Sequence, residues 1–321
     1  MTPVGASGLA RIASDDAAAR TNRGGLGCFA STLTPTAPLE ALSLDWLQGV
    51  ELAVLRLDLI DPLISGNKWF KLSGHLAQAQ SASGVISLGG AYSNHLHALA
   101  AAGKRFGFPT VGLMRGHPQD TPTVLDLNAF GMHLHWLGYG GYRARHQPDF
   151  WLPWRERYPQ FHPVPEGGGG RVGAVGCGVL VDQARAQLGT LGWADYDGWW
   201  LAAGTGTTLA GLALAEAGAH PVYGAMAVPD DHGVAQNVAA IVQGGYELLD
   251  ASRGGFAKVD PLLRTFIEQT EQACGLPLEP LYTGKALLAL KLQIEAGRFR
   301  PGTRLIFIHT GGLQGRRGFG D

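Results

Sequence analysis

Short apolar runs alternate with longer helical stretches along most of this chain, and glycine-rich turns separate them. Runs typical of buried strands occur at residues 85–88, 110–114, 132–137, 199–203, 222–228 and 305–309. Helical patterns occur at 93–106, 121–130, 209–217 and 286–296, and Thr121 and Pro122 have the residue types of an N-cap and a first helical position. Such alternation favours parallel sheets with helices on both faces. The sequence therefore predicts an α/β fold.

The composition narrows the possible classes of protein. The chain has 321 residues, enough for one or two domains, and 45% of them are apolar against 16% charged, which excludes a disordered chain. Lys and Arg number 25 and Asp and Glu 26, so the basic surplus of a nucleic-acid binder is missing. The 48 glycines follow no collagen period and are expected in tight turns and ligand loops.

Cysteine usage and hydropathy give expectations about the compartment. Cys28, Cys177 and Cys274 are too few and too far apart for a disulfide framework or a zinc site, so we expect a reducing, cytoplasmic setting. The uncharged stretch 198–215 has the length of a membrane span, but four Gly and three Thr interrupt it, which predicts a strand, a loop and a helix instead. Residues 1–25 lack apolar periodicity and are expected to form a mobile arm without a signal peptide.

A lysine near residue 70 is a candidate for covalent chemistry. Lys68 stands between a Gly-Asn turn and two aromatic residues in the motif GNKWFKL at 66–72. Partial burial there would lower the pKa of the amine and make it nucleophilic toward a carbonyl. A surface lysine at the start of a helix is the alternative interpretation.

Two glycine-rich turns between a strand and a helix are candidate anion sites. In GGAYSNH at 89–95, free N–H groups at the helix start and the side chains of Ser93, Asn94 and His95 could bind a carboxylate. A plain N-cap, with the histidine incidental, is the alternative. In GTGTT at 204–208, close backbone approach could bind a phosphate, although this is neither a P-loop nor a full G-x-G-x-x-G, and a plain βα turn is the alternative.

Three further segments complete the pattern. The motif YTGK at 282–285 leads into a predicted helix, and HTGG at 309–312 follows the last predicted strand. The glycine-dense region 161–177 is interpreted as a packed ligand loop in preference to a flexible linker. His133 and His135 lie on one face of a predicted strand, but no third ligand has a diagnostic spacing, so no metal site is predicted.

Together these segments resemble the family of 1-aminocyclopropane-1-carboxylate deaminases and D-cysteine desulfhydrases. The motifs GNKWFKL, GGAYSNH, PEGG, GTGTT, YTGK and HTGG occur in the expected order across most of the chain. The resemblance implies a tryptophan-synthase β-like pyridoxal 5'-phosphate enzyme of fold type II, with two domains of mostly parallel sheets flanked by helices. The larger, cofactor-binding domain would comprise residues 26–70 and 180–321 and the smaller α/β domain residues 71–179, with the cofactor in the cleft between them.

The resemblance also implies residue roles. Lys68 would hold the cofactor as a Schiff base, Lys71 would contact its phosphate, and Asn94 would bond its ring hydroxyl. Thr283 would face the pyridine nitrogen. The loop that binds the phosphate would comprise Gly204, Thr205, Gly206, Thr207 and Thr208. The catalytic residues would be Lys68, Ser93 and Tyr282. The substrate-binding residues would be Ser93, Asn94 and His95.

Two departures from the deaminases indicate which activity to expect. Thr283 stands where the deaminases have a glutamate, and the motif reads Ser-Asn-His in place of Ser-Asn-Gln; both match the desulfhydrase-like branch. A hydroxyl supplies no charge at the pyridine nitrogen, so the ring is expected to be neutral and a weaker electron sink, which suits β-elimination. We therefore expect α,β-elimination and deamination of a small, D-cysteine-like amino acid to ammonia and a 2-oxo acid.

Two alternatives to this activity stay open. One is a 1-aminocyclopropane-1-carboxylate deaminase, and the other is a non-catalytic Rossmann-type protein that binds a nucleotide or pyridoxal phosphate. Against a Rossmann-type site, the predicted strand 222–228 lacks the acid expected about 20 residues after the glycine loop. The expected partners are a small amino-acid substrate and a second copy of the chain in a homodimer, with neither nucleic acid nor membrane.

Overall fold

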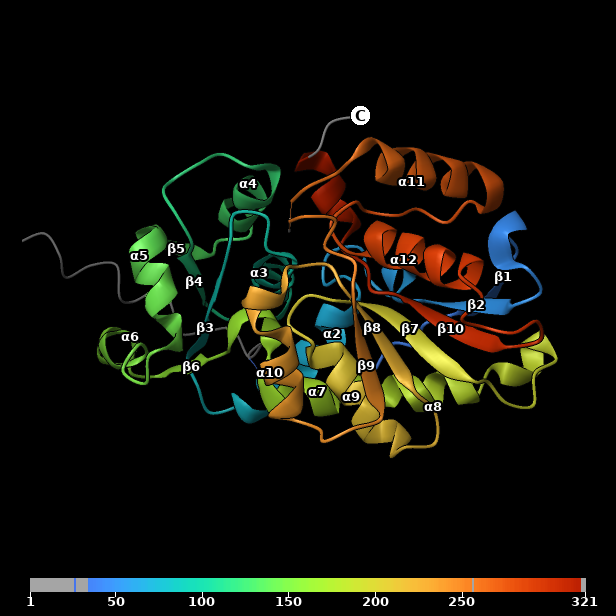
Figure 1. Ribbon diagram of the computed structural model, residues 1–321. Coiled ribbons are helices and arrows are strands. Elements are labelled where there is room, and N and C mark those ends of the chain that lie inside the picture. The colour runs from blue at the N-terminus through green and yellow to red at the C-terminus, as the bar shows by residue number, and fades with distance from the viewer. Residues whose placement is uncertain (1–25, 27–33, 256, 319–321) are drawn as a thin grey trace, which may run out of the picture.

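Two β-sheets organise the chain, and Figure 1 shows them side by side with helices packed against their faces. The computed structural model describes residue 26 and residues 34–255 and 257–318. The predicted arm at residues 1–25 and Cys28 lie outside the described residues.

The larger sheet has the strand order β1-β2-β10-β7-β8-β9. Its strands are β1 (Leu39–Leu42), β2 (Glu51–Arg56), β7 (Gly198–Ala203), β8 (Val222–Met226), β9 (Tyr246–Asp250) and β10 (Arg304–His309). β1 pairs antiparallel with β2, and the other neighbours are parallel. The carboxyl ends of the parallel strands therefore share one edge, which is where ligands bind in open α/β sheets.

The smaller sheet is parallel throughout and has the order β5-β4-β3-β6. Its strands are β3 (Gly84–Gly89), β4 (Thr110–Met114), β5 (His133–Trp136) and β6 (Phe161–Pro163). They all lie inside the segment predicted as the smaller domain, whose limits stay a prediction.

Helices pack against both sheets. The described helices are α2 (Asn67–Gln78), α3 (Asn94–Phe106), α4 (Pro122–Ala129), α5 (Gly138–Arg143), α6 (Leu152–Arg157), α7 (Gly170–Cys177), α8 (Val179–Arg185), α9 (Thr207–Glu216), α10 (Val234–Ala239), α11 (Pro261–Cys274) and α12 (Thr283–Glu295). Of these, α3–α6 lie around the smaller sheet. In Figure 1, α11 and α12 lie on one side of the larger sheet and α7, α8 and α9 on the other.

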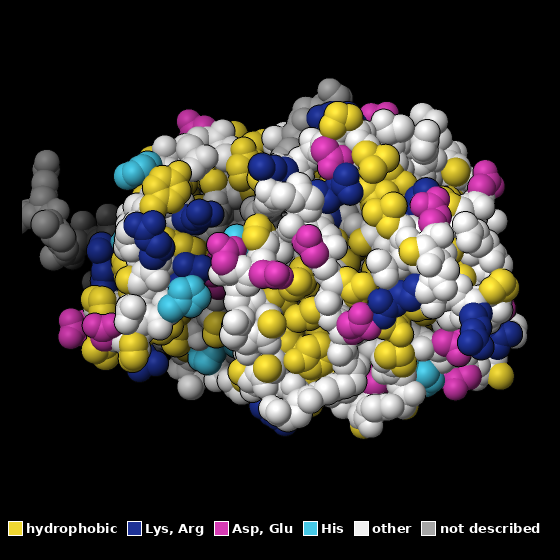
Figure 2. Space-filling view, viewed as in Figure 1, with side chains coloured by type: hydrophobic (Ala, Val, Ile, Leu, Met, Phe, Trp, Pro, Cys, Tyr) yellow, Lys and Arg dark blue, Asp and Glu magenta, His cyan; other side chains and the backbone are white. Residues whose placement is uncertain are grey.

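The surface carries charged side chains of both signs. On the face shown in Figure 2, Lys and Arg are interspersed with Asp and Glu.

Residues of β10 show why this sheet must be covered twice. Ile306 and Ile308 belong to the buried cluster that includes residues of α2 and α9, whereas Leu305 and Phe307 belong to the cluster under α11 and α12. Successive side chains of a strand point to opposite faces, so a strand buried on both sides reads as a continuous apolar run. This is the run that the sequence shows at the end of the chain.

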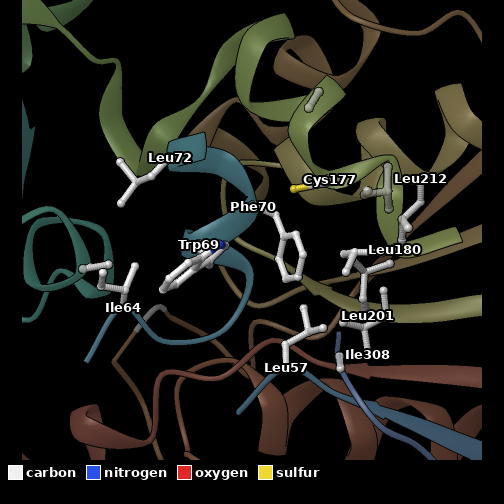
Figure 3. Packing of buried hydrophobic residues seen from close by; sticks show 14 of the residues in the cluster. Leu57, Ile64, Trp69, Phe70, Leu72, Cys177, Leu180, Leu201, Leu212 and Ile308 are labelled. Atoms are coloured by element: carbon white, nitrogen blue, oxygen red, sulfur yellow. The ribbon is translucent and has the colours of Figure 1, made fainter. Parts of the chain in front are cut away.

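Helix α2 is anchored in the larger core by Phe70. This side chain is fully buried, and Figure 3 shows its ring among Leu57, Leu180 and Leu201. The packing fixes the orientation of α2, and residues three apart on a helix are neighbours on its surface. The first turn of α2 therefore carries its two lysines close together.

The predicted fold class is confirmed, with two corrections to helix limits. β4 has the predicted bounds, and Thr121 caps α4 by accepting a hydrogen bond from the N–H of Val124 at 3.1 Å. α9 begins at Thr207, two residues earlier than predicted, and α12 begins at Thr283, three residues earlier. In both cases, residues that were predicted as a loop form the first turn of the helix. Contacts with distant segments hold this turn, and the residue types alone do not indicate these contacts.

Two stretches that the sequence left open, residues 198–215 and 161–177, form regular secondary structure. Residues 198–215 form β7, a turn and most of α9, and among the described residues no helix is long and apolar enough to cross a membrane. The glycine-dense region 161–177 forms β6, a short 3-10 turn at Glu166–Gly168 and α7. It is packed, as expected, and does not form an extended linker.

Candidate active site

The turn before α2 lies directly on the HTGG segment. Gly66 has φ 66°, and a Cβ added there would lie 2.0 Å from the carbonyl oxygen of Thr310. Only glycine allows this approach. The N–H of Asn67 donates to the same oxygen at 3.1 Å. The contact brings the GNKWFKL and HTGG motifs, far apart in sequence, to one place.

Asn67 then links Lys68 to the GTGTT segment. The ammonium nitrogen Nζ of Lys68 donates to Oδ1 of Asn67 at 2.8 Å, and Nδ2 of Asn67 donates to Oγ1 of Thr208 at 2.9 Å. Burial, and to a smaller extent the charge of Lys71, hold the pKa of Lys68 well below its usual range. The neutral amine is the form that attacks a carbonyl or takes up a proton.

Lys71 is a buried cation without a partner in the part of the chain that the structure describes. Its residue is 4% exposed, and within the described residues its ammonium has no hydrogen bond or ion pair. Burial lowers the pKa of Lys71 as well. A Cβ added to Gly168 would lie 3.1 Å from Cβ of Lys71, so the PEGG segment covers this side chain. Because a buried charge is costly unless it is paired, Lys71 fits an anionic ligand.

Ser93 and Asn94 lie at the start of α3. Ser93 is the N-cap, and its Oγ accepts from the N–H of Leu96 at 3.2 Å. Oδ1 of Asn94 accepts from Nε2 of Gln314 at 3.0 Å, and a Cβ added to Gly312 would lie 2.6 Å from Nδ2 of Asn94. The N-cap that was the alternative interpretation is therefore present, and the same turn also contacts the HTGG segment.

His95 faces the smaller sheet. Its Nε2 lies 2.8 Å from Oγ of Ser87 in β3, and this hydroxyl donates to the carbonyl oxygen of Val164 at 2.8 Å. The Nδ1 atom is buried without a hydrogen-bond partner among the described residues, and a Cβ added to Gly168 would lie 3.4 Å from it. The imidazole thus packs behind the PEGG segment, and contact of His95 with substrate stays a prediction.

The GTGTT segment forms the N-terminus of α9. Gly206 is its N-cap with φ 77°, and a Cβ there would lie 2.3 Å from Cγ2 of Val238. Oγ1 of Thr205 and Oγ1 of Thr207 lie 2.9 Å apart, and a Cβ added to Gly167 would lie 2.9 Å from Cγ2 of Thr205. The PEGG segment therefore lies against this turn, whose free N–H groups and helix dipole favour an anion.

Tyr282 closes the same turn from the side of α12. A Cβ added to Gly204 would lie 2.8 Å from Cε1 of Tyr282, so the ring packs closely against Gly204. Burial raises the pKa of Tyr282 well above its usual range. The phenol is therefore neutral at physiological pH and keeps its proton as a hydrogen-bond donor.

A buried glutamate that the sequence analysis missed organises the start of α12. Glu279 is fully buried, and its carboxylate accepts from the N–H groups of Leu281, Tyr282 and Thr283 at 2.7, 2.6 and 2.6 Å. In return, Oγ1 of Thr283 accepts from the N–H of Glu279 at 3.0 Å. This reciprocal bonding resembles a capping box, and an acid four residues before a helix start was the signal that could have found it.

Glu279 should make stability depend on pH. Burial raises the pKa of Glu279 to about 7. Because the native carboxyl keeps its proton where the unfolded one has lost it, the free energy of unfolding should fall as pH rises from the ordinary value of 4.5 toward 7 and then level off. We expect Glu279→Gln to remove this slope, an effect of at most about 3 kcal/mol. Urea unfolding across this pH range measures it.

The exposed Glu268 of α11 provides the control for that measurement. Glu268→Gln should leave the pH dependence of the unfolding free energy as in the wild type, because this side chain reaches solvent. Equal slopes for wild type and Glu279→Gln would contradict the assignment of the titration to the buried carboxyl.

His309 fixes the HTGG segment from the strand side. It is fully buried at the end of β10, where Nε2 donates to the carbonyl oxygen of Pro277 at 2.7 Å and Nδ1 lies 3.1 Å from Oδ1 of Asp58. Arg56 also donates to Asp58, at 2.7 Å. These contacts hold the backbone that Gly66 approaches.

The structure therefore brings most of the predicted residues to the carboxyl edge of the larger sheet. Contacts connect Lys68, Asn94, Thr208, Tyr282 and Thr283 through the motifs in which they stand, and Lys71 lies beneath the PEGG segment. Within the described residues no group of three His, Cys, Asp or Glu could hold a metal ion.

These residues fit pyridoxal phosphate. The ammonium of Lys71, without a partner among the described residues, and the N-terminus of α9 provide for the phosphate. Glycines at 167, 168, 204 and 206 let the backbone lie directly against Thr205, Lys71, Tyr282 and Val238, where side chains would clash. The amine of Lys68, with its lowered pKa, provides for the aldehyde.

Comparisons with known proteins agree with the resemblance that the motifs of this site indicate. No family model matches the chain. It is 27% identical over 317 residues to a 1-aminocyclopropane-1-carboxylate deaminase of Burkholderia vietnamiensis, which covers 87% of this chain and 92% of the relative. It is 26% identical over 322 residues to the mitochondrial bifunctional D-cysteine desulfhydrase/1-aminocyclopropane-1-carboxylate deaminase of Arabidopsis thaliana, covering 89% of this chain and 78% of that protein.

A solved structure has a similar fold. The crystal structure of an ACC deaminase homologue superposes with a TM-score of 0.72 at 24% identity and covers 92% of this chain and 96% of the other. The predicted resemblance and the fold class are confirmed by these matches. Both activities considered from the sequence occur in the names of the relatives.

Proposed function

We propose that this protein is a pyridoxal-phosphate-dependent lyase that eliminates a β-substituent from a small, D-cysteine-like amino acid and releases ammonia and a 2-oxo acid. The observation that carries the proposal is the hydroxyl of Thr283, at the start of α12, in the position where the resemblance expects a deaminase to have a carboxylate. The names of the relatives support the class of activity.

The residues that would hold the cofactor follow from the site. Lys68 would hold it covalently, Lys71 and the turn 204–208 would bind its phosphate, and Asn94 and Thr283 would contact its ring. When bound, pyridoxal phosphate supplies an electron sink for the bonding electrons at the substrate Cα.

Lys68 is the residue that we assign to proton transfer at Cα. Its lowered pKa favours the neutral amine, so Nζ would be able to take the proton from the substrate Cα. The neutral phenol of Tyr282 and the hydroxyl of Ser93 are the neighbouring groups that could deliver a proton to the leaving group. The free N–H groups at the start of α3, with Asn94 and His95 beside them, would bind the substrate carboxylate.

The bonding of Thr283 supports a neutral cofactor ring. One lone pair of Oγ1 accepts from the N–H of Glu279 at 3.0 Å, and the nearest acceptors for its proton, the carbonyl oxygen and Oε1 of Glu279, both lie at 3.4 Å. These two distances exceed those of a normal O–H···O bond, so the proton is available to a ring nitrogen. The hydroxyl brings a donor to that nitrogen and no charge.

Substitutions at Thr283 test this role. Thr283→Val removes the donor at nearly constant shape, and a buried hydrogen bond contributes about 0.5–1.5 kcal/mol, so the elimination rate should fall about tenfold or less. Thr283→Glu adds a carboxylate whose negative charge would keep the pyridine nitrogen protonated. The electrons at Cα would then be held more stably, so elimination from D-cysteine or β-chloro-D-alanine should slow. Rates of 2-oxo acid release measure both.

Thr283→Ser keeps the hydroxyl and serves as the control, with a rate close to that of the wild type. Faster elimination by Thr283→Glu than by wild type would overturn the electronic argument. The new carboxylate would lie beside Glu279, so the double variant with Glu279→Gln separates repulsion between two carboxylates from the effect on the ring.

A panel of D- and L-amino acids, with 1-aminocyclopropane-1-carboxylate included, tests the activity itself. We expect the wild type to release 2-oxo acid from D-cysteine and β-chloro-D-alanine faster than it opens the cyclopropane ring. Ring opening without elimination would establish the deaminase alternative. Absence of turnover on the whole panel, with cofactor bound, would favour the non-catalytic binding protein.

The assembly and location of the chain are proposed from the resemblance alone. We propose a homodimer in the cytoplasm and a cofactor cleft between domains 26–70 with 180–321 and 71–179. Light scattering measures the oligomeric state, and limited proteolysis locates the domain limits.

A further inference from the structure

The ammonium of Lys285 lies in a cage of backbone carbonyl groups. Its Nζ donates to the carbonyl oxygens of Gly255 at 2.7 Å, Ser252 at 2.8 Å and Ala227 at 3.4 Å. The residue is 1% exposed. A lysine ammonium has three N–H donors and no acceptor, so carbonyl oxygens are suitable partners for it.

The three carbonyl groups belong to two segments, the end of β8 and the turn after β9. Ala227 follows β8, and Ser252 and Gly255 lie in the turn after β9. That turn contains Arg253, a non-glycine residue with φ 53°, beside Gly254 with φ 78°. A backbone in this region is strained for a side-chain-bearing residue and persists only where its surroundings fix it.

The position of Lys285 connects this cage to the candidate active site. It lies in the first turn of α12, two residues after Thr283, and its ammonium ties that turn to the carboxyl ends of β8 and β9. Burial lowers the pKa of Lys285 to about 8, while Glu279 and Asp250 favour its charged form. The side chain is therefore mainly a cation at neutral pH.

Backbone carbonyl groups directed at one point are also the ligands of a monovalent cation, whose hydration shell they replace. The separations of 2.7 and 2.8 Å suit an ion of the size of ammonium or potassium better than the smaller sodium ion. A cavity of about 140 Å³, lined by Lys285 with Asp250, Ala251, Arg253, Ala289 and Leu292, adjoins the side chain and offers a path for a free ion.

We propose that Lys285 is a tethered monovalent cation, and that its carbonyl cage becomes a binding site for ammonium or potassium when the side chain is shortened. The tethered charge fixes the turn after β9 and the start of α12 in one arrangement. It acts as a positioning residue for Thr283, and it does so without contacting the reacting atoms.

The test is rescue of Lys285→Ala by salts of different cations, measured first as the melting temperature. In choline chloride, whose cation is too large for the cage, the variant should melt several degrees below the wild type. Ammonium or potassium chloride at equal ionic strength should raise its melting temperature with the logarithm of concentration, as for a ligand of the native state. Sodium should act more weakly, and the wild type should respond equally to all four salts.

Retention of pyridoxal phosphate, followed by its absorbance during dialysis, is the second measurement. Lys285→Ala should lose cofactor roughly tenfold more readily in choline, the effect of one lost charge-assisted hydrogen bond. Ammonium should restore the wild-type rate of loss. The melting measurement needs no cofactor and no substrate, so the cation site and the proposed function can fail separately.

Two matched variants separate charge from packing. Lys285→Met keeps the length of the side chain without its charge, so it should lose as much stability as Lys285→Ala but gain nothing from ammonium, because its stem occupies the space. Lys291→Ala, on the exposed side of the same helix, removes an ion pair with Glu295 and should resemble the wild type in every salt.

Three outcomes would overturn the proposal. They are a Lys285→Ala protein with the same melting temperature in choline and in ammonium, one that fails to fold in every salt alike, and a Lys285→Met protein as stable as the wild type.

Discussion

Replacement of Lys68 by alanine is expected to lower the elimination rate by about a thousandfold or more, since both covalent attachment of the cofactor and proton transfer at Cα would be lost. Borohydride reduction of the wild type should fix pyridoxal phosphate to Lys68, and a peptide map locates the label. The physical reason is the lowered pKa of this amine, next to the oxygen of Asn67 that orients it.

Lys71→Ala is the matched control, three residues along the same helix. It should weaken retention of the cofactor, because a cation for the phosphate is lost, yet reduction should still label Lys68. A label on Lys71 in the wild type, or unchanged turnover by Lys68→Ala, would refute the assignment.

The second large effect is expected at Gly206. A valine there would combine a backbone angle of φ 77° with a Cβ 2.3 Å from Cγ2 of Val238. The turn that precedes α9 would have to shift, and the N–H groups that we assign to the phosphate would shift with it. Cofactor should therefore be lost on gel filtration, while far-ultraviolet circular dichroism stays that of a folded protein.

Gly218 is the matched control for this experiment. It follows the other end of α9 with φ 86°, and a Cβ there would meet no atom within 4 Å. Gly218→Val should cost about 1–2 kcal/mol of stability for the left-handed backbone and leave the cofactor bound. Full retention of pyridoxal phosphate by Gly206→Val would return GTGTT to the status of a plain turn.

Helix α2, which contains Lys68, shows what a local sequence pattern can predict and what it cannot. The motif around Lys68 made this lysine a candidate nucleophile, and the neighbouring aromatic residues suggested its partial burial, with a surface lysine as the alternative. What the pattern lacked was the partner of each group: Asn67 bonds Thr208, 141 residues away, and Gly66 lies on Thr310. Contacts between distant segments leave no periodic signal in a single sequence.

The surroundings of His95 and Glu279 depend on distant segments in the same way. His95 follows two candidate ligand residues in the chain, but one helical step turns its ring toward Ser87 and the smaller sheet. Glu279 stands between two prolines in the sequence, and only the fold shows it fully buried, with three backbone N–H groups on its carboxylate. Residue type indicates what a side chain can do, and its burial depends on which segments pack around it.

The sequence by itself determined the α/β class, the strand at 110–114 to the residue, the cap at Thr121 and the motifs that meet at the candidate site, because these depend on composition, spacing and backbone preference within a few neighbouring residues. The tertiary structure alone decided that α12 begins at Thr283, that the hydroxyl there bonds a buried glutamate, and that Lys285 fills a carbonyl cage. Those features arise where the carboxyl ends of parallel strands, separated by tens of residues, meet at one edge of a sheet.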